Sequence, residues 1–208
     1  MTALLKKATK HSDNKPSKRD AILTAALKVF AERGLNGVAV PEIAELANVG
    51  TGTIYRYFDS KSDLVNELFM NEKHRLHAFL KEGVIDINQP PKDIFAAYWR
   101  RMISFGRTYP DSFKFLELQD HLPYLNEGAR EVEREALRRL NDINKSLQNK
   151  GVFRRDIRSD IILTMIWGSI VSLFKSDHLG YITLSDADIE AAREACWRMC
   201  ATPEYVDR

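Results

Sequence analysis

Hydrogen-bonding and cationic side chains cluster within one short stretch of the chain, TGTIYRYFDSK, which runs from Thr51 to Lys61. Threonine and tyrosine can contact base edges and thymine methyl groups in a major groove, while arginine and lysine can pair with phosphates. A glycine in such a stretch lets the backbone approach a partner closely. This mixture is typical of a helix that lies in a groove of double-stranded DNA. The candidate contacts are Thr51, Gly52, Thr53, Tyr55, Arg56, Tyr57 and Lys61.

The residues before this stretch predict the element that would hold it in place. Pro41 suits the first turn of a helix, where its missing N–H costs nothing, and residues 48–50 then form a short break. Thr51 is a candidate N-cap for the next helix. Two short helices joined by a tight turn that contains glycine make a helix-turn-helix, here residues 39–58. Because helix N-termini favour anions, we expect Val40 and Pro41 to lie against a phosphate.

Two longer helices are predicted on either side of this pair. Apolar residues at helical spacing indicate a helix from about Arg19 that ends at Gly34, and glycine suits a helix C-terminus. Ser60, with Asp63 three residues later, can cap a long helix that continues to about Lys81. The residues of the third helix that should point inward are Ile54 and Phe58.

The stretch from Arg19 to Phe69, RDAILTAALKVFAERGLNGVAVPEIAELANVGTGTIYRYFDSKSDLVNELF, resembles the N-terminal DNA-binding domain of the TetR family of transcriptional regulators. The resemblance combines the pattern of the first helix, the Ile43-Ala44 pair, and the GTIYRYF segment with Lys61 and Leu64 behind it. The chain departs from the family pattern at the turn, where Asn48 replaces a common glycine, and at Gly50 and Thr51. Asparagine tolerates the left-handed backbone that such a turn requires.

The resemblance implies an all-α protein with an N-terminal three-helix, helix-turn-helix DNA-binding domain and a larger C-terminal helical domain for ligand binding and dimerisation. It implies a sequence-specific regulator, a repressor that a small-molecule effector releases from a palindromic double-stranded DNA operator. The alternative is a non-specific or architectural DNA-binding protein without an effector. The expected division is a flexible basic arm over residues 1–16, the DNA-binding domain over 17–77, and the effector-binding and dimerisation domain over 78–208.

The distribution of charge agrees with DNA contact at one end only. Residues 1–63 hold ten lysines and arginines against seven aspartates and glutamates, whereas the whole chain has a net charge of only +2. A basic end on a nearly neutral body favours a protein that touches phosphates with that end.

A pocket for a small apolar or amphipathic effector is expected among aromatic and polar residues of the second domain. Any helical domain also needs such aromatic residues in its core, and solvent exposure is the alternative for the polar ones. The candidate effector contacts are Trp99, Met102, Phe105, Phe113, Phe115, Glu117, His121 and Trp167.

Homodimerisation is expected through the last two helices, about residues 159–175 and 185–200. Their apolar content exceeds what one monomer's core needs, as at an obligate interface. The apolar run from Ile161 to Phe174 is interrupted by polar residues and is shorter than the roughly 20 residues of a membrane span, so we expect a buried helix and no membrane contact.

Other classes of protein lack their patterns in this chain. It has no phosphate-binding glycine loop, zinc-protease motif or nucleophile elbow, so we expect neither an enzyme nor a cofactor. His74 and His77 lack a recognisable third ligand, so no metal is expected. Cys196 and Cys200 lie four apart on one predicted helix, which is poor geometry for a disulfide, and no secretory signal is recognisable. A cytoplasmic location is therefore expected.

Overall fold

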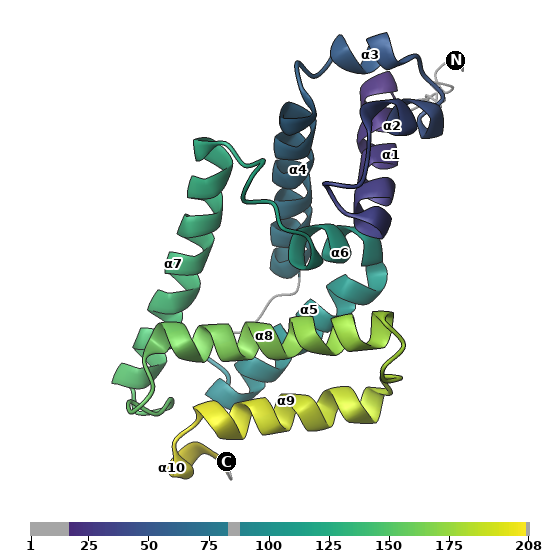
Figure 1. Ribbon diagram of the computed structural model, residues 1–208. Helices are drawn as coiled ribbons and strands as arrows, with labels where there is room; N and C mark the ends of the chain where they lie inside the picture. Colours follow the sequence, from purple (N-terminus) through teal and green to yellow (C-terminus); the bar gives the residue numbers. More distant parts are fainter. Residues whose placement is uncertain (1–16, 83–87, 207–208) are drawn as a thin grey trace, which may run out of the picture.

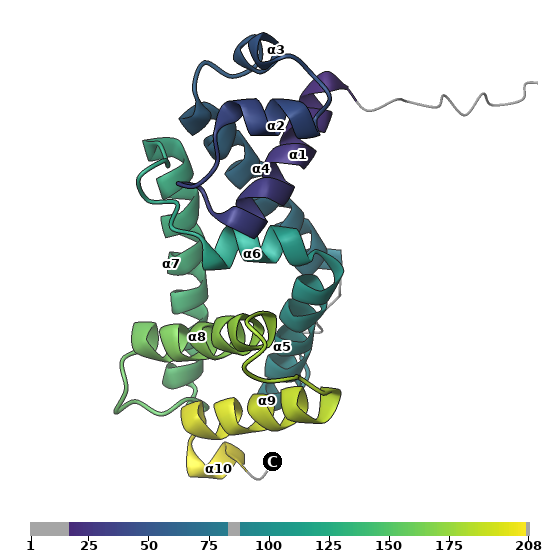
Figure 2. The same cartoon turned by 45° about the vertical axis from the view of Figure 1, so that its right-hand side comes forward.

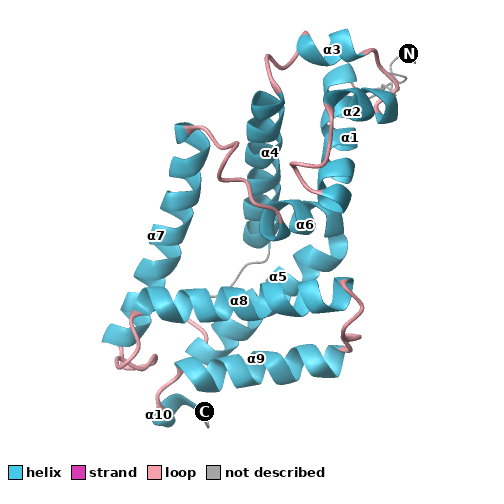
Figure 3. Ribbon diagram, viewed as in Figure 1, coloured by secondary structure: helices cyan, strands magenta, loops and turns pink. Residues whose placement is uncertain are grey.

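The computed structural model describes residues 17–82 and 88–206, and this part of the chain contains ten α-helices and no β-strand (Figure 1). The prediction of an all-α protein is confirmed, as the colouring by secondary structure shows (Figure 3). The expected basic arm, residues 1–16, lies outside the described residues. The helices are α1 Lys18–Arg33, α2 Val40–Leu46, α3 Thr51–Tyr55, α4 Lys61–Glu82, α5 Pro91–Thr108, α6 Pro110–Leu118, α7 Glu127–Asn149, α8 Ser159–His178, α9 Asp186–Cys200 and α10 Pro203–Val206.

Local caps set the ends of the first helices. Ser17 begins α1 with a capping box, in which its hydroxyl accepts from the Asp20 N–H at 3.1 Å. Gly34 ends α1 with φ +77°, a backbone conformation that favours glycine, as predicted. Ser60 accepts from the Asp63 N–H at 3.1 Å at the start of α4, which is also as predicted.

The turn of the helix-turn-helix depends on one residue with left-handed backbone. Asn48 has φ +52° and lies between α2 and α3, as its tolerance of this conformation predicted. The predicted N-cap was wrong by one position: Gly50 is the N-cap, with extended backbone, and its carbonyl accepts from the Thr53 N–H at 2.8 Å. Thr51 is therefore the first residue of α3, because the chain is already helical there.

The helices divide between two ends of the molecule that α4 and α6 connect. Helices α1 to α3 occupy the end farthest from α8 and α9, which lie side by side (Figure 1). Helix α4 runs without a break through residues 77 and 78, where the sequence predicts a domain boundary. Figure 2 shows α6 lying across the lower end of α1, between the N-terminal helices and the α8 layer.

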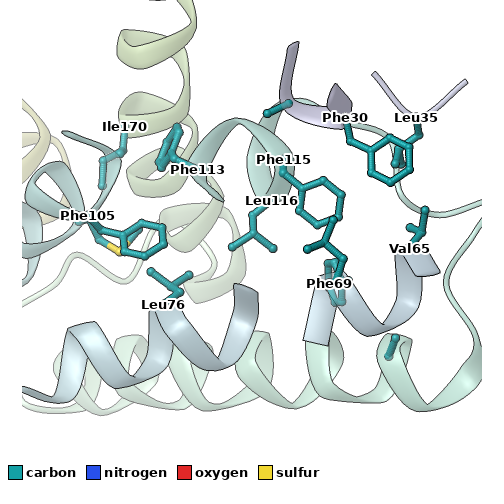
Figure 4. Close-up of a cluster of buried hydrophobic side chains, with 14 of the residues drawn as sticks. Phe30, Leu35, Val65, Phe69, Leu76, Phe105, Phe113, Phe115, Leu116 and Ile170 are labelled. Carbon is teal, nitrogen blue, oxygen red and sulfur yellow. The ribbon is translucent and has the colours of Figure 1, made fainter. Parts of the chain in front are cut away.

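A cluster of buried aromatic and aliphatic side chains extends from the N-terminal helices to α8 (Figure 4). The rings of Phe30 on α1 and Phe115 on α6 stack with centroids 6.3 Å apart. Farther along, Phe113 on α6 contacts Phe174 on α8 with centroids 4.5 Å apart. A displacement of α6 must therefore disturb both the DNA-binding helices and α8, because close-packed side chains leave little room to adjust.

The expectation that the apolar run of α8 forms a buried helix is wrong for the single chain. Only Ser159, Ile162, Ile166 and Ile170 of this helix are buried, and Ile161 is 44% exposed. By length and composition alone α8 could also cross a membrane, a property that it shares with core helices of soluble proteins. The physical reason for the exposure is that α8 packs through one face, on α5, α6, α7 and α9, and its other face has no partner in the described chain.

Replacing Gly106 with alanine is expected to loosen the contact between α5 and α8. A Cβ at this position would lie 2.5 Å from Cζ of Phe174, whose ring is also held by Phe113. We expect Gly106→Ala to lower the free energy of unfolding by about 1–3 kcal/mol, measured by urea denaturation. Gly128→Ala is the control, since its nearest contact would be an ordinary 3.4 Å. Equal stability of the two variants would contradict the close approach.

Candidate nucleic-acid interface

The outer face of α3 presents the predicted contact residues to solvent. Tyr55 is 51% exposed and Tyr57 is 40% exposed, while Ile54 and Phe58 are buried beneath them, as predicted. The buried pair anchors α3 on the other N-terminal helices, so the exposed hydroxyls have a fixed direction. The remaining exposed or half-exposed candidates on this face are Thr51, Gly52, Thr53 and Arg56.

Gly52 leaves the backbone of α3 open to a partner. A Cβ built at this position would have no heavy atom within 4 Å, so nothing in the fold itself requires glycine there. The guanidinium of Arg56 lies 5.7 Å from the centre of the Tyr57 ring. This contact holds the cation beside the outer face of α3, in reach of a phosphate on a bound duplex.

The start of α2 differs from the expectation at one of its two residues. Val40 is only 7% exposed and packs in the core, so its side chain cannot lie against a phosphate, whereas Pro41 is exposed. The carboxylate of Glu42 accepts from the Ala39 N–H at 2.8 Å and pairs with Arg33. The hydrogen bond from Arg33 holds the pKa of Glu42 below its ordinary value. The carboxylate of Glu42 thus already lies at the N-terminus of α2.

Lys61 points inward rather than toward the outer face. Its Nζ donates to the carbonyl oxygens of Val38, at 2.6 Å, and of Leu35, and it lies 5.6 Å from the centre of the Tyr124 ring. Burial lowers the pKa of this ammonium group. Lys61 therefore connects α4 to the α1–α2 loop through these hydrogen bonds. This inward position does not support the predicted contact of Lys61 with a phosphate.

Single substitutions of Lys61 and of Arg56 distinguish a structural role from a phosphate contact. We expect Lys61→Met to lower the free energy of unfolding by about 1–3 kcal/mol, because two loop carbonyls lose their donor. Arg56→Ala should leave the free energy of unfolding unchanged. It should also reduce the slope of DNA affinity against salt concentration by the amount expected for the loss of about one phosphate contact. Urea denaturation and salt titration of DNA binding measure the two effects. A stable Lys61→Met protein with a reduced salt dependence would restore Lys61 to the interface.

The sequence missed a connection between the α6–α7 loop and the DNA-binding helices. Asn66 of α4 is 7% exposed and donates through Nδ2 to the Tyr124 carbonyl at 2.7 Å. Its Oδ1 accepts from the Asn126 N–H at 2.8 Å, and the Tyr124 hydroxyl donates to Asn36 at 2.8 Å. An asparagine at a core position of an amphipathic helix was the available signal, because buried polar groups need hydrogen-bond partners.

The predicted effector residues separate into two groups. Five of them are buried in the core of the second domain, where core packing was the alternative to an effector contact: Trp99, Met102, Phe105, Phe113 and Phe115. Of the other three, Trp167 and Glu117 contact each other, and His121 packs among aromatic rings. Trp167 donates through Nε1 to Glu117 Oε2 at 2.8 Å, and the His121 ring lies between those of Phe69 and Phe115. Neither Glu117 nor His121 is solvated surface.

Two surface hollows lie outside the predicted effector residues. The larger, about 390 Å³, is a groove between α8 and α9 with small side chains along it, Ser169, Ser172, Ser176, Ala192 and Ala195 among them. The smaller, about 260 Å³, lies between α5 and the start of α9, where Arg100 pairs with Glu190 and Arg107 with Asp186.

Two family models together match the chain from residue 22 to residue 202. The model described as bacterial regulatory proteins, tetR family, matches residues 22–68, and the model described as tetracyclin repressor-like, C-terminal domain, matches residues 69–202. The chain belongs to the TetR family. It is a DNA-binding transcriptional regulator and not an enzyme, as predicted.

Similar proteins agree with this assignment over most of the chain. The HTH-type transcriptional repressor NicS of Pseudomonas putida is 30% identical over 146 residues, which is 67% of each chain. The repressor KstR2 of Mycobacterium tuberculosis is 26% identical over 159 residues, 72% of this TetR regulator and 76% of KstR2. A TetR-family regulator from Vibrio parahaemolyticus has a solved structure with a TM-score of 0.68 at 26% identity, covering 89% of this chain and all of that one.

Proposed function

We propose that this TetR regulator is a homodimeric repressor that binds a palindromic operator through α3 and is released by a small-molecule effector. The single observation that carries the DNA contact is the outer face of α3, whose hydroxyls and Arg56 are exposed above a buried Ile54 and Phe58. The repressor assignment is supported by NicS and KstR2, which are both named as transcriptional repressors. The proposed base and phosphate contacts are Pro41, Thr51, Gly52, Thr53, Tyr55, Arg56 and Tyr57.

Dimerisation follows from how little one copy of α3 can bury on DNA. Two recognition helices spaced by one helical turn read both halves of a palindrome and compete better with genomic DNA. The groove between α8 and α9 is the proposed contact, because its serines and alanines let the helices of a second copy approach closely. That contact would cover the side of α8 that the single chain leaves open, on which Ser172 is exposed.

Release would be transmitted through α6 and α4. Helix α6 packs against α1 through Phe30 and Phe115, and Asn66 of α4 holds the loop that follows α6. An effector that moves α6 would change the spacing of the two copies of α3, typically at a coupling of about 1–3 kcal/mol. The domain division proposed above, 17–77 and 78–208, and a cytoplasmic location complete this proposal.

The test is a selection of duplexes from a random DNA pool by the purified protein, followed by salt titration of the enriched sequence. We expect one palindrome to be enriched, with half-sites about one helical turn apart. Tight binding with a steep salt dependence and no enriched sequence would overturn the proposal in favour of a non-specific DNA-binding protein.

A further inference from the structure

A charged cluster lies where α4, α6, α7 and α8 meet. Lys73 of α4 and Glu117 of α6 have side chains that are 8% and 10% exposed, and Glu133 of α7, whose side chain is 37% exposed, completes the cluster at its edge. Buried charges are costly unless each is paired and hydrogen-bonded. The pairing of these three groups therefore determines what this interior can bind.

The pairing within the cluster is incomplete at Glu117. The Nζ of Lys73 lies 2.8 Å from Glu133 Oε2 but 3.9 Å from Glu117 Oε1. Glu117 Oε2 accepts from the Trp167 indole, whereas Oε1 is buried and finds no hydrogen-bond partner among the described residues. Glu133 Oε2 also has no hydrogen bond of good geometry there, but it has the short ion pair with Lys73 that Glu117 Oε1 lacks. One ammonium group thus faces two carboxyl groups. Burial raises the pKa of Glu117, and the charge of Lys73 and the hydrogen bond from Trp167 offset this only in part.

A second unmatched polar atom lies close by on the α6–α7 loop. Nε2 of His121 is buried and has no hydrogen-bond partner in the part of the chain that the structure describes, although the ring contacts Phe69 and Phe115. Burial lowers the pKa of His121 to about 4, so the imidazole is neutral at neutral pH. The ring therefore adds no positive charge to balance the second carboxylate.

The wall formed by α7 has few buried residues. Of its 23 residues only Ala129 and Asn144 are buried, and most of its length is exposed or half-buried. Helix α7 stands to one side of α4, and the α6–α7 loop and α8 lie at its two ends (Figure 1). Elements with few buried contacts open at low free energy, so a ligand can reach the cluster beside α7.

We propose that the effector is an amphipathic organic cation, an amine whose ammonium group binds Glu117 and whose apolar body packs against the aromatic side chains around it. This inference rests on the proposed effector-controlled function. An ammonium group donates to Glu117 Oε1 and balances the second carboxylate, which is the strong, charge-assisted kind of hydrogen bond. A carboxylate ligand would instead have to displace Glu133 from Lys73. Trp167 and the half-buried Tyr98, whose pKa is raised by burial and by the charge of Glu117, supply the aromatic surroundings.

The test uses three compounds that share one apolar body and differ in the head group: phenylbutylamine, phenylbutanol and phenylbutanoate. Binding to the full-length dimer is followed by tryptophan fluorescence, with Trp167→Phe to assign the signal. We expect the amine to bind at least about tenfold more tightly than the other two. Glu117→Gln, which keeps an acceptor for the Trp167 indole, should abolish this preference, and Glu131→Gln on the exposed face of α7 should not.

The outcomes separate this inference from the proposed function. A preference for phenylbutanoate, equal binding of the three compounds, or no binding of the amine to the unchanged protein would overturn the cationic effector. The comparison of head groups on the unchanged protein stands even where Glu117→Gln does not fold. Amine binding that needs Glu117 but leaves operator affinity unchanged would support the ammonium site and contradict effector release. Release by a compound that is indifferent to Glu117 would overturn the site and preserve the function.

Discussion

Tyr55→Ala is expected to weaken operator binding by about 2–6 kcal/mol per dimer, because each of two half-sites loses a contact worth about 1–3 kcal/mol. Tyr55 is 51% exposed on α3. Its removal should therefore leave the free energy of unfolding within about 0.5 kcal/mol of the parent value. Fluorescence anisotropy with the selected operator measures the affinity, and urea denaturation measures the stability.

Two further variants sharpen the prediction for Tyr55. Tyr55→Phe keeps the ring and removes the hydroxyl, so it separates a hydrogen bond to a base or phosphate from an apolar contact. Tyr181→Ala, which removes a 77% exposed tyrosine from the loop between α8 and α9, is the matched control and should bind the operator like the parent. If Tyr55→Ala binds the operator as tightly as the parent protein does, Tyr55 is not part of the DNA interface.

Ala195→Glu is expected to convert the dimer to a monomer at micromolar concentration and to abolish operator binding with it. Ala195 lines the groove between α8 and α9, where the helices of a second copy would bury the new carboxylate without a partner. Leaving a buried charge unpaired costs about 3–5 kcal/mol, and a two-fold interface contains the substitution twice. Light scattering on the purified protein gives the mass, and anisotropy gives the operator affinity.

Ala187→Glu is the control for this substitution, because Ala187 is exposed on the same helix and does not line the groove. It should remain dimeric and bind the operator normally. A dimeric Ala195→Glu protein would show that the second copy binds elsewhere. If the parent protein is a monomer, the proposal that two copies read the two halves of a palindromic operator is contradicted.

The helix-turn-helix could be read from the sequence because its signals are local. Helical spacing of apolar residues, the glycine at residue 34, the cap at Ser60 and the tolerance of Asn48 for left-handed backbone each act within a few residues. The inward direction of Ile54 and Phe58 follows from the same spacing. Such signals determine where helices begin, end and face, so most of α1 to α4 matched the expectation.

The direction of the polar side chains could not be read in this way. Lys61 looks like a phosphate contact in the sequence, yet its Nζ is held by the carbonyls of Leu35 and Val38, more than twenty residues away. From the sequence alone, solvent exposure was favoured over a pocket for Glu117 and His121, yet the tertiary structure buries most of both side chains. Asn66 was missed because its partners lie on a loop about sixty positions later.

The sequence by itself determined the helices, the helix-turn-helix and the family, because each depends on residue types at short, regular spacing. Only the tertiary structure decided which charges are buried, which loop Asn66 holds, and that α8 is buried along one side only. These features depend on contacts between residues far apart in the chain. Close packing and the need to pair buried polar groups select those contacts, and neither acts on a short segment alone.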